Sequence, residues 1–293
     1  MAQQNSTNNL KLISFVSFNL HGFNQGFATV NDLIDSVDPD LFLVQEHWLT
    51  PANLSRFDIF TNYFTFGCSA MNEVIESGML KGRPFGGAMI MIKKELRQLT
   101  ETVFCSNRYA IVRVANLLFI NVYLPCSGTL NRLTICQDLL VEIWSWCEQF
   151  SHCQCIFAGD FNVNLDNSDP VSDLLNSMLS EHSLLRRDVL FSKTNIPTYV
   201  NTALNHQSTI DYVITSCKDI IDDFVILDPD INFSDHLPIM AKCRYIDHES
   251  AAVMSKINNS DNSHSALPVQ FRWDHADLIG YYRYTPACGY NLC

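Results

Sequence analysis

The sequence predicts an α/β protein in which two packed β-sheets carry helices on their outer faces. The first observation is that short apolar segments of strand length, rich in β-branched or aromatic residues, recur along the chain. The second is that helical patterns are fewer and lie between some of these segments. Two packed sheets with outer helices satisfy both observations, because every apolar face then has a partner. The periodicity by itself does not select this architecture over other α/β folds.

Nine segments are expected to form strands, because each is apolar, short and bounded by polar or turn residues. They are Leu12–Phe18, Leu41–Val44, Ala88–Ile92, Ala110–Val114, Leu117–Val122, Cys155–Ala158, Ile210–Thr215, Phe224–Leu227 and Ile239–Cys243. Leu117–Val122 is apolar except for Asn121. That pattern is typical of a strand buried on both faces.

Three helices are expected between these strands. Within 129–150, apolar residues recur at steps of three and four, which places them on one face of a helix. They are Leu133, Cys136, Leu140, Ile143, Cys147 and Phe150. Asp169 and Pro170 resemble an N-cap followed by proline at the first helical position, so a helix is expected to run from there toward Ser180. A shorter helix is expected over 28–37.

The composition predicts one large folded domain with a tail at each end. A chain of 293 residues can bury a full core, and 47% hydrophobic against 17% charged residues is a globular composition. Residues 1–10 are polar and are expected to be disordered. The folded domain is expected over 11–246. A tail follows over 247–293, and it opens with the linker His248–Pro268, which is rich in Ser, Asn and Asp.

The net charge of −12 argues against a protein that coats nucleic acid through bulk charge. It does not exclude an enzyme whose site carboxylates are offset by a metal ion. The basic residues are also concentrated in one stretch, 81–113, where they outnumber the acidic ones. These are Lys81, Arg83, Lys93, Lys94, Arg97, Arg108 and Arg113. This stretch is either a cationic surface or a set of solvated strand edges.

The 11 cysteines are irregularly spaced and form no CxxC pair, which argues against a structural zinc site. Cys105, Cys155, Cys217 and Cys243 lie in apolar runs, as free buried cysteines do, and this favours a reducing compartment. The N-terminus has neither the basic nor the apolar region of a signal peptide, and no apolar stretch approaches the ~20 residues of a membrane helix. We therefore expect a soluble intracellular protein.

Polar side chains stand where several of the expected strands end. The positions are Asn19, Glu46, Tyr123, Asp160, Asn162, Asp211, Asp235 and His236. Burying a carboxylate costs several kcal/mol unless it is paired or bound to a metal. So many acids and amides near strand ends predict one shared polar site at the rim of the sheets.

Such a site suits one kind of chemistry. Carboxylate and amide oxygens are ligands for Mg²⁺ or Mn²⁺, and a hard cation can polarise a phosphoryl oxygen. An aspartate can activate the attacking water, while histidine and asparagine donors can hold the phosphoryl oxygens. The G-x-S-x-G motif of serine hydrolases and the phosphate-binding P-loop are both absent from the sequence. The polar residues therefore favour metal-assisted hydrolysis of a phosphoester.

Six motifs carry a resemblance to a known family. In chain order they are Asn19-Leu-His-Gly22, Gln45-Glu46, Asn121-Val-Tyr-Leu-Pro125, Gly159-Asp-Phe-Asn162, Ile210-Asp-Tyr212 and Ser234-Asp-His236. Together they resemble the endonuclease/exonuclease/phosphatase family, which includes abasic-site endonucleases and DNase I. The resemblance covers roughly 11–245. It implies the DNase-I-like fold, a four-layer α/β sandwich of two packed, mainly antiparallel sheets flanked by helices.

Two further segments resemble the endonuclease domain of non-LTR (LINE-type) retrotransposons. Gly82–Gly87, with the sequence GRPFGG, is similar to a segment that precedes a strand in those domains. Phe271–Tyr282 is similar to the stretch that joins them to a reverse transcriptase, although no Tyr-x-Asp-Asp follows. The resemblance implies a monomeric enzyme that nicks DNA, leaves a 3′-hydroxyl and acts in the nucleus, and that is normally fused to a polymerase absent here.

The resemblance also implies a role for each matching position. Glu46 would be the principal ligand of Mg²⁺ or Mn²⁺, with Asn19 and Asp235 close to the metal. Asp160 would orient and activate the water. Asn162 would hydrogen-bond the phosphate or the water, and Tyr123 would contact the phosphate. His236, held by Asp211, would bind the scissile phosphate oxygens.

Other positions would support the site or bind DNA. Thr198 and Ser234 would lie behind the catalytic groups. A hairpin over Asn201–Gln207 would contact DNA, and its candidate DNA-binding residues are Asn201, Asn205 and His206.

The sequence departs from one relative at His21. Abasic-site endonucleases carry an acid two residues after the first asparagine, and here that position is histidine. This argues against a second metal ligand there and against specialised abasic-site repair.

Two alternatives remain open from the sequence. A phosphatase of the same fold, acting on inositol or lipid phosphoesters, would need nearly the same site. A catalytically inactive relic would keep the fold alone. Each residue also has a structural interpretation, and Trp48, Trp144 and Trp146 are expected to be core or surface aromatics.

Overall fold

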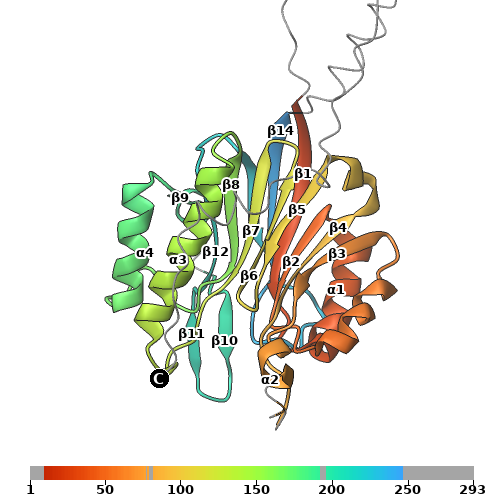
Figure 1. Ribbon diagram of the computed structural model, residues 1–293, viewed down its shortest axis with the longest axis vertical. Coiled ribbons are helices and arrows are strands. Elements are labelled where there is room, and N and C mark those ends of the chain that lie inside the picture. Colours follow the sequence, from red (N-terminus) through yellow and green to blue (C-terminus); the bar gives the residue numbers. More distant parts are fainter. Residues whose placement is uncertain (1–9, 77, 79–81, 192–195, 247–293) are drawn as a thin grey trace, which may run out of the picture. The chain divides into compact units, whose positions relative to one another are not determined.

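Figure 1 shows the computed structural model, which describes residues 10–76, 78, 82–191 and 196–246. The linker His248–Pro268 and the segment Phe271–Tyr282 lie outside the described residues. Of the expected disordered segment 1–10, only Leu10 is described, and it begins the first strand.

Two six-stranded sheets form the centre of the domain. The first sheet has the order β13-β14-β1-β2-β4-β3, with β13 Ile221–Ile226, β14 Ile239–Ile246, β1 Leu10–Asn19, β2 Leu41–Gln45, β4 Ala88–Lys93 and β3 Tyr63–Cys68. The second has the order β5-β6-β7-β8-β12-β9, with β5 Thr100–Cys105, β6 Tyr109–Val114, β7 Leu117–Tyr123, β8 Gln154–Asp160, β12 Asp211–Thr215 and β9 Leu185–Arg186. A separate hairpin consists of β10 Tyr199–Asn201 and β11 His206–Ser208.

Each sheet has one parallel pair at its centre. β1 pairs with β2 in parallel, and β7 pairs with β8 in parallel, while the other pairs are antiparallel. A parallel pair needs a long crossover, and in both sheets a helix supplies it. α1 Phe23–Val37 connects β1 to β2, and α3 Arg132–Gln149 connects β7 to β8.

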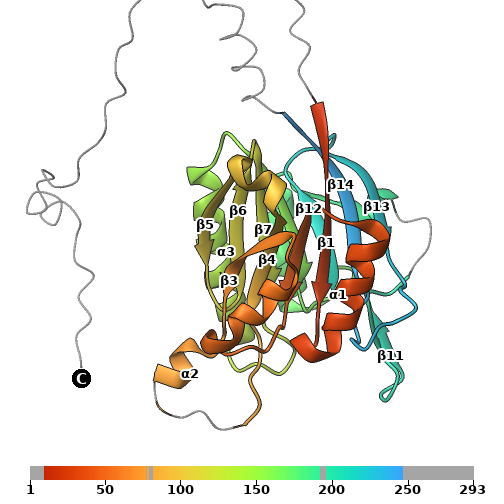
Figure 2. The same cartoon turned by 90° about the vertical axis from the view of Figure 1, so that its right-hand side faces the viewer.

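The helices cover the outer faces of the two sheets and complete four layers (Figures 1 and 2). One apolar cluster fills the space between the sheets, with Phe15 of β1 packed edge-on against Phe119 of β7. A second cluster lies between the first sheet and α1. A third lies between the second sheet, α3 and α4 Pro170–Glu181. The predicted four-layer α/β sandwich with mainly antiparallel sheets is therefore confirmed.

All nine expected strands are present, with ends that differ by a few residues. The periodicity missed β3 and β5, which lie at the edges of their sheets and are mostly only half-buried. Their sequences mix apolar and polar residues, since Thr65 and Gly67 interrupt β3 and Glu101 and Thr102 interrupt β5. The expected helix over 28–37 begins earlier, at Phe23, and Asp169 caps α4 by accepting the Val171 N–H at 2.9 Å.

Short elements connect these layers. They are the 3₁₀ helices η1 Pro51–Ile59 and η2 Lys94–Leu99, and the helices α2 Asn72–Glu76 and α5 Arg187–Phe191. Among the described residues no helix is long and apolar enough to cross a membrane.

A disulfide corrects one expectation about the cysteines. Cys68 at the end of β3 and Cys105 at the end of β5 are joined, with their Cα atoms 5.9 Å apart, so Cys105 is not free. The two edge strands come from different sheets, and the bond links them. Such bonds persist mainly in oxidising compartments, which opposes the expectation of a reducing one. Cys155, Cys217 and Cys243 are free as expected.

Three basic residues of the stretch 81–113 have different surroundings. Arg113 pairs with Glu101, and Lys93 pairs with Asp38. Arg83 instead lies over the ring of Trp48. These side chains belong to separate strands and loops with partners of their own.

Candidate active site

Strand register brings the sequence-predicted polar residues to one end of the two sheets. In the first sheet Asn19 is aligned with Gln45, the residue before Glu46. In the second sheet Asp160 lies between Tyr123 on β7 and Asp211 on β12. This is the lower end of the sandwich in Figure 1, from which the β10–β11 hairpin projects.

A cleft of about 480 Å³ opens at this end of the sheets. It is lined by residues of several loops, including His21, Glu46, Asn162, Tyr199, His206, Asp235 and His236. Asp160 and Asp211 are buried beside it. Six loops far apart in sequence thus contribute to one polar cleft, as the strand-end pattern predicted.

The backbone turns sharply where the strands enter the cleft. His21, Glu46, Trp48 and Asn162 all have positive φ values, between 50° and 54°. This conformation is uncommon for residues other than glycine and is often found at functional sites. It needs support from neighbouring backbone, and Glu46 N–H donates to the Gly87 carbonyl at 2.9 Å.

Asp160 is the most completely held carboxylate of the site. Its Oδ1 accepts the Asn162 backbone N–H at 2.8 Å. Its Oδ2 accepts from the side-chain amides of Asn19 at 2.9 Å and Asn162 at 3.0 Å. Burial raises the pKa of Asp160, although the nearby positive charge of His236 opposes that shift. A carboxyl with a raised pKa is better suited to accept a proton than an ordinary surface aspartate.

His236 is buried and surrounded by carboxylates. Its Nδ1 donates to Asp211 Oδ2 at 2.9 Å, and its Nε2 lies 3.9 Å from Asp160 Oδ2 and 3.9 Å from Asp235 Oδ1. Burial alone would lower the pKa of His236, but the charges of Asp211, Asp160 and Asp235 outweigh burial and raise the pKa to about 10. The imidazole is therefore protonated at neutral pH, with its Nε2 proton directed at the cleft.

Glu46 lies across the cleft from this group. Its Oε1 accepts from the Asn19 amide at 3.2 Å, and its Oε2 accepts from the indole N–H of Trp48 at 3.0 Å. Tyr123 is close enough to interact with Glu46, and burial raises the pKa of its hydroxyl, so Tyr123 remains a proton donor. The oxygen of the Asn19 amide is itself occupied, because it accepts the His21 backbone N–H at 3.0 Å.

Asp235 forms an ion pair with His21 at the mouth of the cleft. His21 Nδ1 lies 2.9 Å from Asp235 Oδ1, and the pair raises the pKa of His21. Ser234 supports this segment, since its hydroxyl donates to the Asn19 carbonyl at 2.7 Å and accepts the His236 N–H at 3.1 Å.

Thr198 connects the hairpin to the site. Its hydroxyl accepts the backbone N–H groups of Ile210 at 3.1 Å and Asp211 at 3.0 Å. The ring of Tyr199 then packs edge-on against His236, with 5.1 Å between the ring centroids. The base of the hairpin is therefore part of the polar cluster around His236.

The candidate DNA-binding residues lie on that hairpin, within and around its turn. Asn201 ends β10 and accepts the Leu204 N–H, Asn205 has a φ of 47° in the turn, and His206 begins β11. His206 also lines the cleft, and it is exposed together with Asn205. Within the hairpin, Asn201 donates to the Tyr199 hydroxyl at 3.1 Å, and the ring of His206 contacts the ring of Tyr199.

Three buried side chains are close enough together to be considered as a metal site. Ligand atoms of Asp160, Asp211 and His236 lie within 4.8 Å of one another. His236 already donates one proton to Asp211 and keeps the other, so it offers no lone pair to a cation. The carboxylates of Asp235 and Glu46, which both line the cleft, are better candidates, because hard cations prefer such oxygens.

Sequence reasoning missed two residues that organise the cleft. Trp48 donates to Glu46 and contacts the ring of His21 at 4.8 Å. Arg132, at the start of α3, donates to the carbonyl of Asn162 at 2.7 Å and to that of Pro125 at 3.0 Å. The sequence around Arg132 does not indicate this role, because the carbonyl to which Arg132 donates is 30 residues away in the chain.

A family comparison agrees with this geometry. The model of the Endonuclease/Exonuclease/phosphatase family matches residues 16–236. The chain belongs to that family. Members of the endonuclease/exonuclease/phosphatase family are phosphoester hydrolases that depend on a divalent metal, and the acidic cleft fits that chemistry. A comparison with curated proteins finds no significant match.

Solved structures share the fold of this family member at low identity. The catalytic domain of Xenopus laevis APE2 is 20% identical with a TM-score of 0.64, over 80% of this chain and 94% of that one. The endonuclease domain of TRAS1, a telomere-specific non-LTR retrotransposon, is 17% identical with a TM-score of 0.58. The match covers 80% of this chain and 98% of that one. The 3′ phosphatase NExo from Neisseria, an Asp-to-Asn variant bound to product DNA hairpin, is 16% identical with a TM-score of 0.59. The match covers 80% of this chain and 99% of that one.

Proposed function

We propose that this protein nicks DNA, by hydrolysing one phosphodiester bond with Mg²⁺ or Mn²⁺ and leaving a 3′-hydroxyl, as the endonuclease domain of a retrotransposon would. The observation that carries the proposal is the opposition of two buried groups at one cleft. Asp160 is a carboxylate whose pKa is raised, and His236 is an imidazole held positively charged. Their environments assign one to accept a proton and the other to donate hydrogen bonds to an anion.

The metal would be held by Glu46 and Asp235. Both side chains line the same cleft, and carboxylate oxygens are the ligands that a hard cation prefers. Asn19 donates to both Glu46 and Asp160, so it would fix the distance between the metal ligand and the base. Bound Mg²⁺ would supply the positive charge that polarises a phosphoryl oxygen.

Asp160 would orient the attacking water and take its proton. Three N–H donors from Asn162 and Asn19 fix both oxygens of the carboxylate, so the geometry of the base does not depend on the substrate. Burial raises its pKa toward the working pH, where a general base is most effective.

His236, Asn162 and Tyr123 would bind the phosphate. His236 would donate from Nε2 to a nonbridging oxygen and would stabilise the negative charge that develops there. Asp211 holds the ring through Nδ1 at 2.9 Å and keeps it charged. Tyr123 keeps its proton because burial raises the pKa of the hydroxyl.

DNA is our preferred substrate because of the projecting hairpin. β10 and β11 stand out from the lower end of the sandwich in Figure 1. Tyr199 and His206 of this hairpin line the cleft, and the turn carries exposed polar side chains. A duplex with its phosphate in the cleft would extend past this hairpin, and Asn201, Asn205 and His206 would contact it. Target preference would then depend on the hairpin and on how easily the DNA deforms.

A phosphatase acting on inositol or lipid phosphoesters is the second candidate. The net charge of −12 favours it, because a small soluble substrate meets less long-range repulsion than DNA does. The catalytic roles above would be unchanged.

Assays with a labelled DNA duplex and with inositol polyphosphates distinguish the two candidates. We expect Mg²⁺-dependent cutting of one strand, with product ends that a DNA polymerase extends without further treatment. Ends that cannot be extended would contradict the proposed 3′-hydroxyl product. Phosphate release from inositol polyphosphates, together with intact DNA, would establish the phosphatase. Neither reaction would mean that the protein is an inactive relic.

A further inference from the structure

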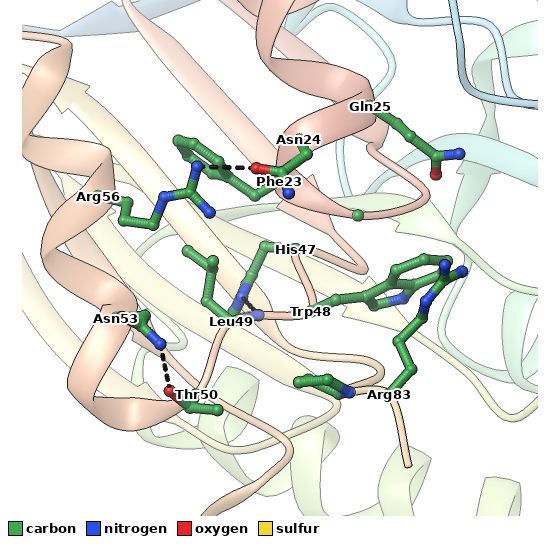
Figure 3. A pocket seen from close by; sticks show the side chains of 12 residues that line it. Phe23, Asn24, Gln25, His47, Trp48, Leu49, Thr50, Asn53, Arg56 and Arg83 are labelled. Atoms are coloured by element: carbon green, nitrogen blue, oxygen red, sulfur yellow. Dashed lines mark hydrogen bonds between the residues drawn. The ribbon is translucent and has the colours of Figure 1, made fainter.

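A second pocket lies beside the catalytic cleft and has no role in the chemistry above. Its volume is about 350 Å³, which is within the range of small-molecule sites, about 300–1,000 Å³. It lies between the first turn of α1, the segment after β2 and the segment before β4 (Figure 3). Its walls include Asn24, Trp48, Leu49, Arg56 and Arg83.

The charge of this pocket is opposite to that of the cleft. Two arginines line it, and no carboxylate does, in a chain whose net charge is −12. Arg56 donates to the Asn24 side chain at 2.7 Å and lies over the Phe23 ring. Within the described part of the chain neither Arg56 nor Arg83 forms an ion pair. Their charges are therefore available to an anionic ligand.

Trp48 and Arg83 form a stacked platform in this pocket. The guanidinium carbon of Arg83 lies 5.5 Å from the Trp48 ring, and Figure 3 shows the two side chains side by side. The indole also rests on Gly22, where a Cβ would approach the ring to 2.7 Å. Gly22 and Arg83 thus both hold the indole in place, and a ligand in the pocket would meet the indole and the guanidinium together. Planar guanidinium and aromatic groups are the surfaces on which unstacked bases pack.

Trp48 also connects the platform to the catalytic cleft. Its indole N–H donates to Glu46 Oε2 at 3.0 Å, so the platform is in direct contact with the proposed metal ligand. Bases in a strand of duplex DNA are about 3.4 Å apart along the axis. A DNA strand with its phosphate at Glu46 would therefore place its next nucleotides at Trp48.

The GRPFGG segment holds this arrangement together. The carbonyls of Gly86 and Gly87 accept the N–H groups of Trp48 at 3.0 Å and Glu46 at 2.9 Å. Gly87 has a φ of +96°, and a side chain there would collide with the ring of His47. The glycines thus fix the turn that carries Glu46 and Trp48, while Arg83 of the same segment reaches over the indole.

We propose that this pocket is a nucleotide subsite, which receives one unstacked nucleotide of the DNA strand next to the scissile phosphate. The base packs on the Arg83–Trp48 platform, and the charge of Arg56 attracts the neighbouring backbone phosphate. The proposal rests on DNA being the substrate. It adds a contact that would make cutting sensitive to the base at one flanking position.

Binding of a fluorescein-labelled 20-base-pair duplex to the full chain tests the subsite without any chemistry. The measurements use Asp160→Asn protein, so that the duplex stays intact. Because stacking of one base contributes about 1–3 kcal/mol, Arg83→Ala should weaken binding roughly tenfold. Arg97→Ala is the matched control, because Arg97 lies over the Phe64 ring at 5.0 Å, outside this pocket. It should change binding less than about twofold.

Photochemical crosslinking locates the base directly. Duplex with 5-iodouracil in place of thymine should crosslink to the peptide that contains Trp48, and Arg83→Ala should reduce the yield. Crosslinks confined to other segments, or equal affinity of the Arg83→Ala and parent proteins, would overturn the subsite. So would a lack of DNA binding. Arg83-dependent binding and crosslinking without any nicking by the parent chain would instead overturn the proposed function and leave the subsite standing.

Discussion

At the scale of single residues, His236 sets the electrostatics of the cleft. Three aspartates surround it, and their combined charge outweighs the cost of burying an imidazolium. Asp160 is affected in turn, because the positive ring partly offsets the burial that raises its pKa. The two groups must therefore be considered as one unit, in which a change at either alters the protonation of the other.

The proposed roles predict large losses of activity from small changes. Asp160→Asn keeps the shape of the side chain but removes the base, and His236→Ala removes the donor to the phosphate. Each should lower kcat for DNA nicking by about 100-fold or more, because positioned acid–base groups contribute about 10²–10⁴. Single-turnover cutting of a labelled duplex measures this. Rates within a few fold of the parent for both variants would contradict the mechanism.

The charge of His236 also makes stability depend on pH. Its pKa is raised from 6.5 to about 10 in the fold, so its contribution is complete below pH 6.5 and is lost as the pH rises toward 10. The Tm of the metal-free protein should fall over that range, and His236→Gln should show a smaller fall. The NMR titration of the His236 ring is an independent measurement. A midpoint near 6.5 would show that the aspartates do not hold the proton.

Trp48 should act on the metal through Glu46. Trp48→Phe keeps an aromatic ring but loses the N–H that donates to Glu46 Oε2. Groups that hold a metal ligand typically affect affinity by about 10–100-fold, so Mn²⁺ should bind roughly tenfold more weakly. Calorimetric titration with Mn²⁺ measures this. Trp144→Phe is the matched control, since Trp144 donates to Glu148 at 3.1 Å on the surface of α3, and unchanged Mn²⁺ affinity in Trp48→Phe would refute the role.

At the scale of elements, Thr198 anchors both the hairpin and the start of β12. Its buried hydroxyl accepts two backbone N–H groups, and Thr198→Val would leave both unpaired. We expect a loss of about 1–3 kcal/mol in the free energy of unfolding, measured by urea denaturation. Thr198→Ser should restore most of it. Thr202→Val, at an exposed position of the hairpin, should have little effect, and equal losses for Thr198→Val and Thr202→Val would contradict the account.

Elements were the part of the fold most readily predicted from sequence. Apolar runs such as Leu117–Val122 identify buried strands because both faces need apolar partners, whereas the edge strands β3 and β5 gave no such pattern. Motifs at strand ends identified the candidate site, because strand register determines which ends meet. The sequence could not reveal Arg132 or the disulfide partner Cys68, since both depend on contacts between segments far apart in the chain.

At the scale of the whole molecule, the hydrogen bonds of one residue and one disulfide connect the sheets and supplement the apolar core. Asn121 of β7 donates to the Val44 and Met89 carbonyls of the first sheet at 2.9 and 3.0 Å, and accepts from Gln45 at 2.6 Å. The Cys68–Cys105 disulfide joins the outer edges. Because Glu46 follows β2 of one sheet and Asp160 ends β8 of the other, these connections should keep the two carboxylates at a constant separation.

Reduction of the disulfide should therefore lower stability. The bond closes a loop of 37 residues, and loops of that size typically yield about 2–4 kcal/mol. Urea denaturation with and without a reductant measures the difference, which should vanish in Cys68→Ser. Cys126→Ser, at an exposed free cysteine, should keep the full response to reductant. An unchanged midpoint of the parent under reduction would contradict the contribution.

The most direct test of the central claim is nicking of supercoiled plasmid by the full chain. The account predicts Mg²⁺-dependent conversion to open circle, abolished by EDTA and lost in Glu46→Gln. Glu95→Gln, at an exposed glutamate of η2, should cut like the parent. Conversion that persists in Glu46→Gln, or that does not require a divalent metal, would contradict the assignment of the cleft as a metal-dependent nuclease site.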